Sequence, residues 1–122
     1  MTDLCPCMQG EPFDNCCGPL LSGEKSAATA AQLMRSRYTA FARGDRDYLI
    51  RSWHRSTRPK PLRLDPDQRW LRLEIVGTTG GGLLEAEGTV EFRAHYEQNG
   101  RRDVLHQNSN FVKQDGRWVY LE

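Results

Sequence analysis

Cysteine is missing from most of this sequence: no cysteine follows residue 17, although four lie within the first 17 residues. Long apolar runs are also missing, and none approaches the roughly 20 residues that a helix needs to cross a bilayer. The first residues contain neither a basic segment nor an apolar stretch, so no secretory signal is visible. We therefore expect a cytoplasmic protein with no membrane partner.

A strong charge of one sign is absent as well. The formal net charge is +1, from 17 Lys and Arg residues and 16 Asp and Glu residues. This balance argues against a dedicated nucleic-acid-binding protein. Basic residues are in excess over residues 35–72, which could contact RNA or an acidic partner. Such a stretch is more commonly a solvated face with counter-charges beside it. We therefore do not expect a nucleic-acid partner, although the sequence does not exclude one.

The cysteines that are present form two close pairs, C-x-C at residues 5–7 and C-C at residues 16–17. Four thiolates on one short segment match the tetrahedral coordination of Zn²⁺, with Zn–S bonds of about 2.3 Å. A bound metal would also give a fixed shape to residues 1–25, which are rich in glycine and proline but poor in apolar side chains. We predict one structural zinc ion, with these ligands: Cys5, Cys7, Cys16 and Cys17.

Two other states of the cysteines are possible. Four cysteines can form disulfides in three connectivities, and a pair of thiols can be redox-active. Clustered cysteines in a reducing cytoplasm are more commonly metal ligands, and the familiar redox spacing is C-x-x-C. The sequence therefore favours a metal and leaves both alternatives open.

Apolar residues at helical spacing predict two helices after residue 25. Ser26 or Thr29 can cap a first helix that runs to about Ala42, and Gly44 would end it. Asp45 can cap a second helix, which must end before the prolines at positions 59 and 61. One stripe of the first helix is apolar except for an arginine: Ala30, Leu33, Met34, Arg37, Tyr38 and Phe41.

The second half of the sequence changes to a period of two. Strands are predicted over residues 70–75, 84–96, 104–113 and 117–121, with a glycine-rich loop at residues 77–82. Asn-Gly at residues 99–100 and Asp-Gly at residues 115–116 are typical hairpin turns. Helices followed by an antiparallel meander indicate an α+β fold.

Residues 105–111 depart from clean alternation, because polar groups occur on both faces of this predicted strand. Polar groups on the inner face favour a ligand-holding concavity beneath the helices, toward which an arginine of the first helix would also point. The alternative is a hydrogen-bonded polar cluster that orders the core. The candidate pocket residues are Arg37, Tyr38, Trp53, His54, His106 and Asn108.

Several segments resemble a known family. The cysteine pattern resembles the SEC-C zinc-binding motif, although Met8-Gln9-Gly10 stands where that motif usually has Gly-Ser-Gly. Residues 33–41, 47–49, 53–59, 111–112 and 116–118 resemble the YchJ-like family of bacterial proteins. The resemblance implies a SEC-C zinc knuckle at residues 1–25, then a cone-shaped α+β domain at residues 26–122. This domain would be of the nuclear-transport-factor-2-like (NTF2-like) type, with a curved sheet around a helix and a pocket.

Two functions remain open. A zinc knuckle could present a rigid surface to a protein or ribosomal partner, and four thiolates would leave the metal no open position for chemistry. Alternatively, the cone could hold a small molecule and act as a binding protein or an isomerase- or hydrolase-like enzyme. We predict no catalytic residue, because no Asp or Glu falls clearly on an inward position beside the candidate pocket residues. The enzyme reading is therefore the weaker one.

Overall fold

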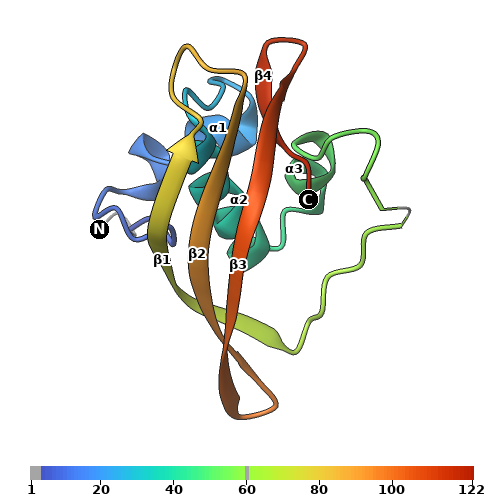
Figure 1. The fold of residues 1–122 in the computed structure, drawn as a ribbon. Helices are drawn as coiled ribbons and strands as arrows, with labels where there is room; N and C mark the ends of the chain where they lie inside the picture. Colours follow the sequence, from blue (N-terminus) through green and yellow to red (C-terminus); the bar gives the residue numbers. More distant parts are fainter. Residues whose placement is uncertain (1–3, 60) are drawn as a thin grey trace.

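Helices occupy the first half of the chain and strands the second half, as the sequence pattern predicts (Figure 1). The structure, a computed structural model, describes residues 4–59 and 61–122. In chain order the elements are η1 (Phe13–Asn15), α1 (Gly18–Ser22), α2 (Ala30–Arg43), α3 (Arg46–Arg51), β1 (Gln68–Gly80), β2 (Glu87–Gln98), β3 (Arg101–Gln114) and β4 (Arg117–Tyr120). No helix in the described part of the chain is long and apolar enough to cross a membrane.

The predicted helix boundaries are confirmed by their caps. Thr29 Oγ1 accepts a hydrogen bond from the backbone N–H of Gln32 at 3.1 Å and so begins α2. Gly44 ends this helix in the left-handed conformation, with φ 73°, which a residue without a Cβ adopts at little cost. Asp45 then accepts from the N–H of Tyr48 and begins α3. Pro66 lies in a short turn that the N–H of Gln68 closes by donating to the Asp65 carbonyl at 3.2 Å.

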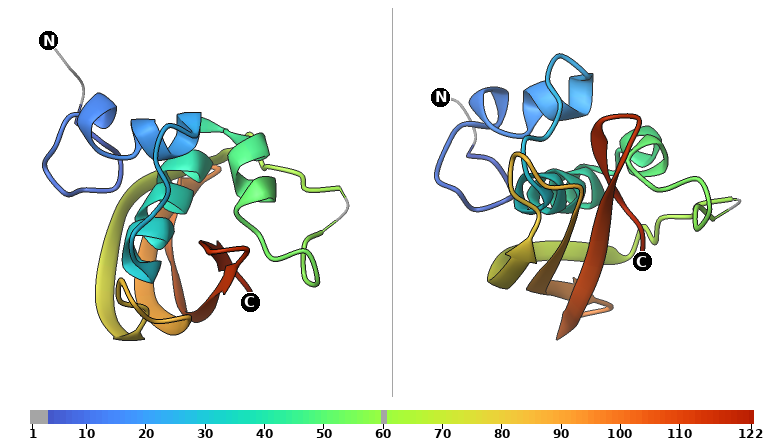
Figure 2. Two further views of the ribbon diagram at one scale, coloured as in Figure 1. Left: turned by 90° about the horizontal axis from the view of Figure 1, so that it is seen from above. Right: turned by 45° about the horizontal axis from the view of Figure 1, so that its top comes forward.

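The four strands form one antiparallel meander in the order β1-β2-β3-β4. β1 is longer than predicted, because Thr78 and Thr79 pair with Val90 and Thr89 in the segment that we expected to be a loop. Its register shifts twice, between Trp70 and residue 72 and again near residue 76. Such bulges bend a strand and increase its twist. The sheet accordingly curves around α2 (Figure 2).

Helix α2 lies between the curved sheet and the N-terminal segment (Figure 2). Its apolar stripe packs on the sheet, but Ser36, Thr39 and Ala40 on its other sides are also fully buried. Those sides are covered by the knuckle (residues 1–25, of which the structure describes residues 4–25) and by α3. Knuckle residues such as Cys17 and Leu21 share one hydrophobic cluster with α2. The domain boundary at residue 25 stays a prediction, but the two predicted parts share a core.

Candidate metal centre and cavity

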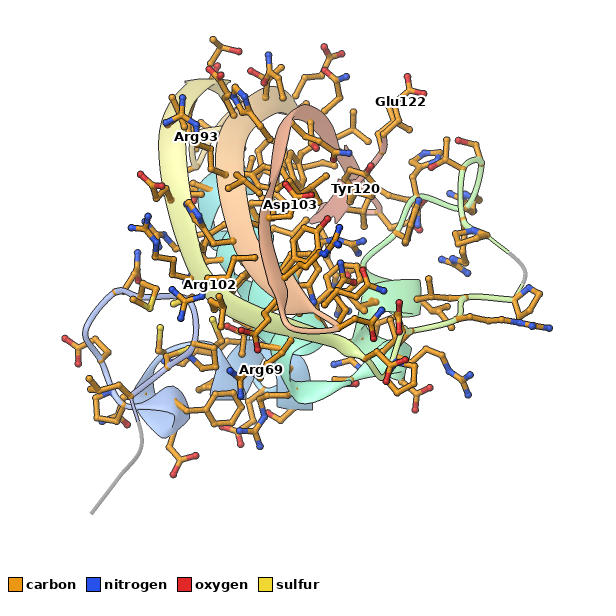
Figure 3. The ribbon with its side chains drawn as sticks, turned by 90° about the horizontal axis from the view of Figure 1, so that it is seen from below. Arg69, Arg93, Arg102, Asp103, Tyr120 and Glu122 are labelled. Carbon is orange, nitrogen blue, oxygen red and sulfur yellow. The ribbon has the colours of Figure 1, made fainter. Side chains whose placement is uncertain are left out.

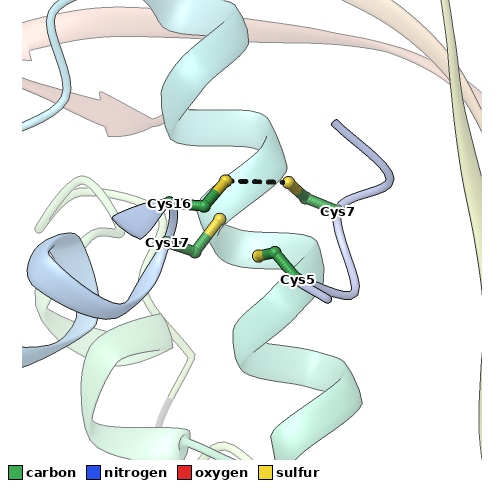
Figure 4. Close-up of side chains that lie close together, drawn as sticks. All are labelled: Cys5, Cys7, Cys16 and Cys17. Atoms are coloured by element: carbon green, nitrogen blue, oxygen red, sulfur yellow. Dashed lines mark hydrogen bonds between the residues drawn. The ribbon is translucent and has the colours of Figure 1, made fainter. Parts of the chain in front are cut away.

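The four cysteine side chains converge beside α2 (Figure 4). Cys5 and Cys7 lie on the loop before η1, and Cys16 and Cys17 lie between η1 and α1. Their Sγ atoms all lie within 4.8 Å of one another, and all four are free thiols. A tetrahedron of sulfurs with metal bonds of about 2.3 Å has edges of about 3.8 Å. The cluster therefore has the size of a four-sulfur metal site.

Burial and crowding control the charge that this cluster can carry. Cys7 is fully buried, Cys5 and Cys17 are 3% exposed, and Cys16 is half-buried. Hydrogen bonds, chiefly with the Cys17 thiol, lower the pKa of Cys7 to about 5. Burial raises the pKa of Cys16 to about 12. Four thiolates can coexist here only beside a cation, so this donor set fits a divalent metal that prefers sulfur.

Helix α2 supplies the contacts that hold the knuckle. Thr39 donates its hydroxyl to Cys17 Sγ at 3.3 Å and lies 3.6 Å from Cys5 Sγ. Arg35 Nη1 donates to the carbonyl oxygen of Cys7 at 2.7 Å. One helical turn after Thr39, the Arg43 guanidinium lies 4.0 Å from the centre of the Phe13 ring. The cysteine cluster is thus joined to the helix that also forms a wall of the cavity described below.

Replacing Thr39 with valine is expected to weaken metal binding about 10-fold or more, because hydrogen bonds to ligand atoms orient them. Valine keeps the shape of the side chain but removes the hydroxyl that reaches Cys17. Competition with a chelating dye measures the metal affinity. Thr29→Val, which alters a distant cap, is the control. Equal affinity in the Thr39→Val and Thr29→Val proteins would show that the hydroxyl does not support the site.

A cavity of about 280 Å³ lies between α2 and the concave face of the sheet. Leu105 and Gln107 of β3 line it and are also exposed, so the cavity opens to solvent beside them. Six of its lining residues are aromatic, which makes it mostly apolar with a few polar groups, as ligand pockets commonly are. The lining residues are Met34, Arg37, Tyr38, Phe41, Trp53, Gln68, Trp70, Phe92, Ala94, Leu105, Gln107, Ser109 and Tyr120.

Arg37 is the only charged residue in the described lining of this cavity, and it is 3% exposed. Its Nη1 donates to the Leu49 carbonyl at 2.9 Å and to Ser52 Oγ at 2.7 Å. Its guanidinium carbon lies 4.8 Å from the Trp53 ring centre and 4.7 Å from that of Tyr120. Burial lowers the pKa of Arg37 to about 10, so the side chain stays protonated at neutral pH.

Hydrogen-bond donors remain unused beside the cavity. Within the described ranges, Arg37 forms no ion pair, and its Nε and Nη2 atoms have no protein acceptor. The Nε1 of Trp53 is fully buried and has no hydrogen-bond partner there, whereas the free donors of Arg37 keep some contact with solvent. A buried donor without an acceptor costs about 1–3 kcal/mol, and buried charges are normally paired. The arrangement is suited to an acceptor that is negatively charged.

The structure places three of the six candidate pocket residues in the lining: Arg37, Tyr38 and Trp53. His54 is outside it, in the turn after α3, where its Nδ1 accepts the backbone N–H of Ser56 at 3.0 Å. The candidate residues on β3 were also expected to face the cavity, and this expectation is wrong for both.

His106 and Asn108 lie on the convex face of the sheet. His106 Nε2 is 2.7 Å from Glu91 Oε2 of the neighbouring strand, and Asn108 is exposed. Alternate residues of a strand face opposite sides, and fully buried Phe111 faces α2. Counting back by twos from Phe111 places Ser109, Gln107 and Leu105 inward. The large aromatic side chain at position 111 was therefore the signal in the sequence that indicates which residues of β3 point inward.

Sequence reasoning also missed Tyr120 and Trp70. Tyr120 pairs with Phe111 on β3 and reaches the Trp53 ring, with the ring centres 5.0 Å apart. Trp70 on β1 contacts Tyr38 and lies at the opposite edge of the sheet from Tyr120. Aromatic residues in predicted strands were the available signal, but only the curvature of the sheet brings these two edges around one helix.

Comparisons with known proteins agree with this architecture. Residues 29–122 match the family model for the middle, NTF2-like domain of YchJ. The chain is 48% identical to a UPF0225 protein of Streptomyces coelicolor over 121 residues, which are 99% of this chain and 94% of that protein. It is 46% identical to a UPF0225 protein of Chromobacterium violaceum over 121 residues, covering 96% of this chain and 89% of that protein.

Two solved structures are similar over nearly the whole chain. The solution structure of a SEC-C motif containing protein from Rhodopseudomonas palustris has a TM-score of 0.85 and 36% identity, and the match covers 100% of this chain and 96% of that one. The crystal structure of a SEC-C motif containing protein from Psychrobacter arcticus has a TM-score of 0.80 and 25% identity, with 97% and 80% covered. The chain therefore belongs to the YchJ-like family of UPF0225 proteins, in which a cysteine-rich SEC-C motif precedes an NTF2-like α+β domain.

Proposed function

We propose that the protein binds a small molecule in the cavity, and that a structural zinc ion fastens the knuckle to the back of the helix that forms the cavity wall. The observation that carries this proposal is Arg37, a buried cation beside a ligand-sized space with no carboxylate partner in the described residues. A cation held in this way is costly for a purely structural core. It is expected where a ligand supplies the missing charge.

Zinc is the metal that best suits the donor set. Four cysteine sulfurs favour Zn²⁺ over the cations that prefer oxygen ligands. All four ligands would come from the protein, so the ion would have no open position and would contribute folding free energy rather than chemistry. Elemental analysis of the purified protein should find about one zinc per chain, and another metal at that stoichiometry would correct the assignment.

Binding suits the cavity better than catalysis. Its described lining offers one guanidinium, two phenols, amides, a serine hydroxyl and apolar surface. Proton transfer by an enzyme needs an acid or base within hydrogen-bond reach of the substrate, most commonly a carboxylate or an imidazole. No carboxylate or imidazole is among the described lining residues. Glu91 and His106 pair on the convex face of the sheet, and His54 lies in the turn after α3.

The three tryptophans provide a test of the binding site. Trp53 and Trp70 line the cavity, whereas Trp118 lies outside it and donates its Nε1–H to the Ala28 carbonyl. Aromatic fragments that bind in the cavity should shift the indole ¹H–¹⁵N signals of the two lining tryptophans and leave that of the third unchanged. A fragment library that moves only the Trp118 signal, or none, would contradict the proposed function.

Contact of the knuckle with a protein or ribosomal partner is the second candidate function. It is favoured by two large apolar side chains on the knuckle surface, Leu4 at 67% and Met8 at 57% exposure. Met8 has φ 72°, so Met8→Asn removes the apolar group and keeps a residue that tolerates this backbone conformation. We expect this variant to lose partners that the wild-type protein captures in a pull-down or a ribosome co-sedimentation. Unchanged capture would count against a contact through this surface.

A further inference from the structure

We infer that the cavity takes a planar aromatic molecule that carries one carboxylate, and that this carboxylate binds Arg37 at the β4 side of the cavity. The inference rests on the proposed function, because it names the class of ligand for the same site. It depends on three features of the described residues: a cation with unused donors, an aromatic region across the cavity from it, and a small volume.

The first feature is the orientation of the guanidinium. Nη1 is occupied by the Leu49 carbonyl and Ser52 Oγ at the end of α3, which leaves Nε and Nη2 for another acceptor. Two nitrogens on one side of a rigid fork match the two oxygens of a carboxylate. The rings of Trp53 and Tyr120 contact the guanidinium and hold it in place.

The second feature lies at the opposite edge of the sheet. Trp70 of β1 is surrounded by other rings, with its centre 6.0 Å from that of Tyr38, 5.8 Å from that of Phe41 and 5.3 Å from that of Tyr96. Three of these four rings line the cavity. Flat aromatic groups pack well against such rings, either stacked or edge to face. A ligand that spans the cavity would therefore place its charge near β4 and its apolar body near β1.

The third feature is size. At about 280 Å³ the cavity is just below the range that is common for ligand pockets, about 300–1,000 Å³. This volume suits one or two fused rings better than a nucleotide. A single cation neutralises a single negative charge, which favours a carboxylate over a phosphate dianion.

A purely structural role for Arg37 makes a different prediction. If Arg37 only connects α2 to the end of α3, the two hydrogen bonds of Nη1 are sufficient for that role. The cavity should then bind charged and neutral molecules of the same shape equally well. The charge preference of the bound molecule therefore separates the two roles, whereas a loss of stability on mutation would not.

The test compares 2-naphthoate with 2-naphthamide, which share a ring system and differ in charge. Titration of the wild-type protein, followed through the indole signals of Trp53 and Trp70, should show at least about 10-fold tighter binding of the naphthoate. Arg37→Gln should abolish this preference. Arg93→Gln makes the same change of charge on the exposed convex face of the sheet, opposite the side on which Tyr120 lies (Figure 3), and should retain it.

The outcomes separate the inference from the proposed function. Equal binding of both probes at the lining tryptophans would overturn the carboxylate inference while supporting a binding cavity. Loss of the preference in Arg93→Gln as well as in Arg37→Gln would also overturn it, because the effect would then be one of overall charge. Absence of any shift with either probe would overturn the carboxylate inference, and the fragment library described above would then decide the proposed function. The two-probe comparison on wild-type protein decides the question even if Arg37→Gln does not fold.

Discussion

A Cys17→Ser protein is expected to lose its bound metal and to unfold at a temperature at least about 10 °C below that of the wild type. Serine removes one of four sulfur ligands from a closed site, and structural zinc provides about 10–16 kcal/mol of binding free energy in small zinc domains. Losing a few kcal/mol of this lowers the unfolding midpoint by several degrees per kcal/mol in a chain of this size. Because Cys17 is buried in the cluster that includes α2, the destabilisation should reach the whole chain.

Zinc content by elemental analysis and a thermal melt followed by circular dichroism measure both effects. Asp14→Asn is the matched control, since Asp14 lies in η1 of the same knuckle and is exposed. It should keep its metal and the wild-type midpoint. Full zinc retention by Cys17→Ser would refute this ligand set. Loss of zinc with an unchanged midpoint would show instead that the α+β domain folds independently of the knuckle.

The second large effect is expected from Phe111→Ala, which should reduce the free energy of unfolding by about 3–5 kcal/mol. Phe111 on β3 is fully buried, and its ring centre lies 5.7 Å from that of Tyr120. Alanine would leave a cavity in the middle of the sheet-to-helix packing, because β3 and α2 cannot collapse into it without breaking strand pairing. Chemical denaturation at fixed zinc concentration measures the change.

Asn110→Ala is the control for the strand itself. Asn110 is next to Phe111 but is exposed, so its replacement should change the free energy of unfolding by less than about 0.5 kcal/mol. A cost below 1 kcal/mol for Phe111→Ala would mean that this side chain does not support the core. The inward facing of Leu105, Gln107 and Ser109, which we count from Phe111, would then need another explanation.

Features that depend on near neighbours were predictable. The cap at Thr29, the stop at Gly44 and the cap at Asp45 each involve hydrogen bonds across only a few residues. The hairpin turns at residues 99–100 and 115–116 are also local, because Asn-Gly and Asp-Gly pairs readily adopt the positive φ angles that a two-residue turn requires. The cysteine pattern predicted that the four sulfurs lie together, because all four belong to one short segment that can close on itself.

The direction in which the β3 side chains face, and the contacts between segments far apart in the chain, were less predictable. Polar residues on both sides of β3 led us to expect His106 and Asn108 on the inner face, whereas pairing with β2 and β4 together with the burial of Phe111 turns both outward. The burial of Ser36 and Thr39 was also unexpected. Small polar residues on the back of an amphipathic helix normally face water, and here the knuckle and α3 cover them.

By itself the sequence determined the order of helices and strands, their caps and turns, and a cluster of four sulfur donors. These depend on backbone propensities and on short-range hydrogen bonds, which act between residues close in the chain. Only the tertiary structure decided that Arg37 meets Trp53 and Tyr120, and that the knuckle shares a core with α2. Those contacts join residues far apart in the chain, and they form only after the sheet has curved around the helix.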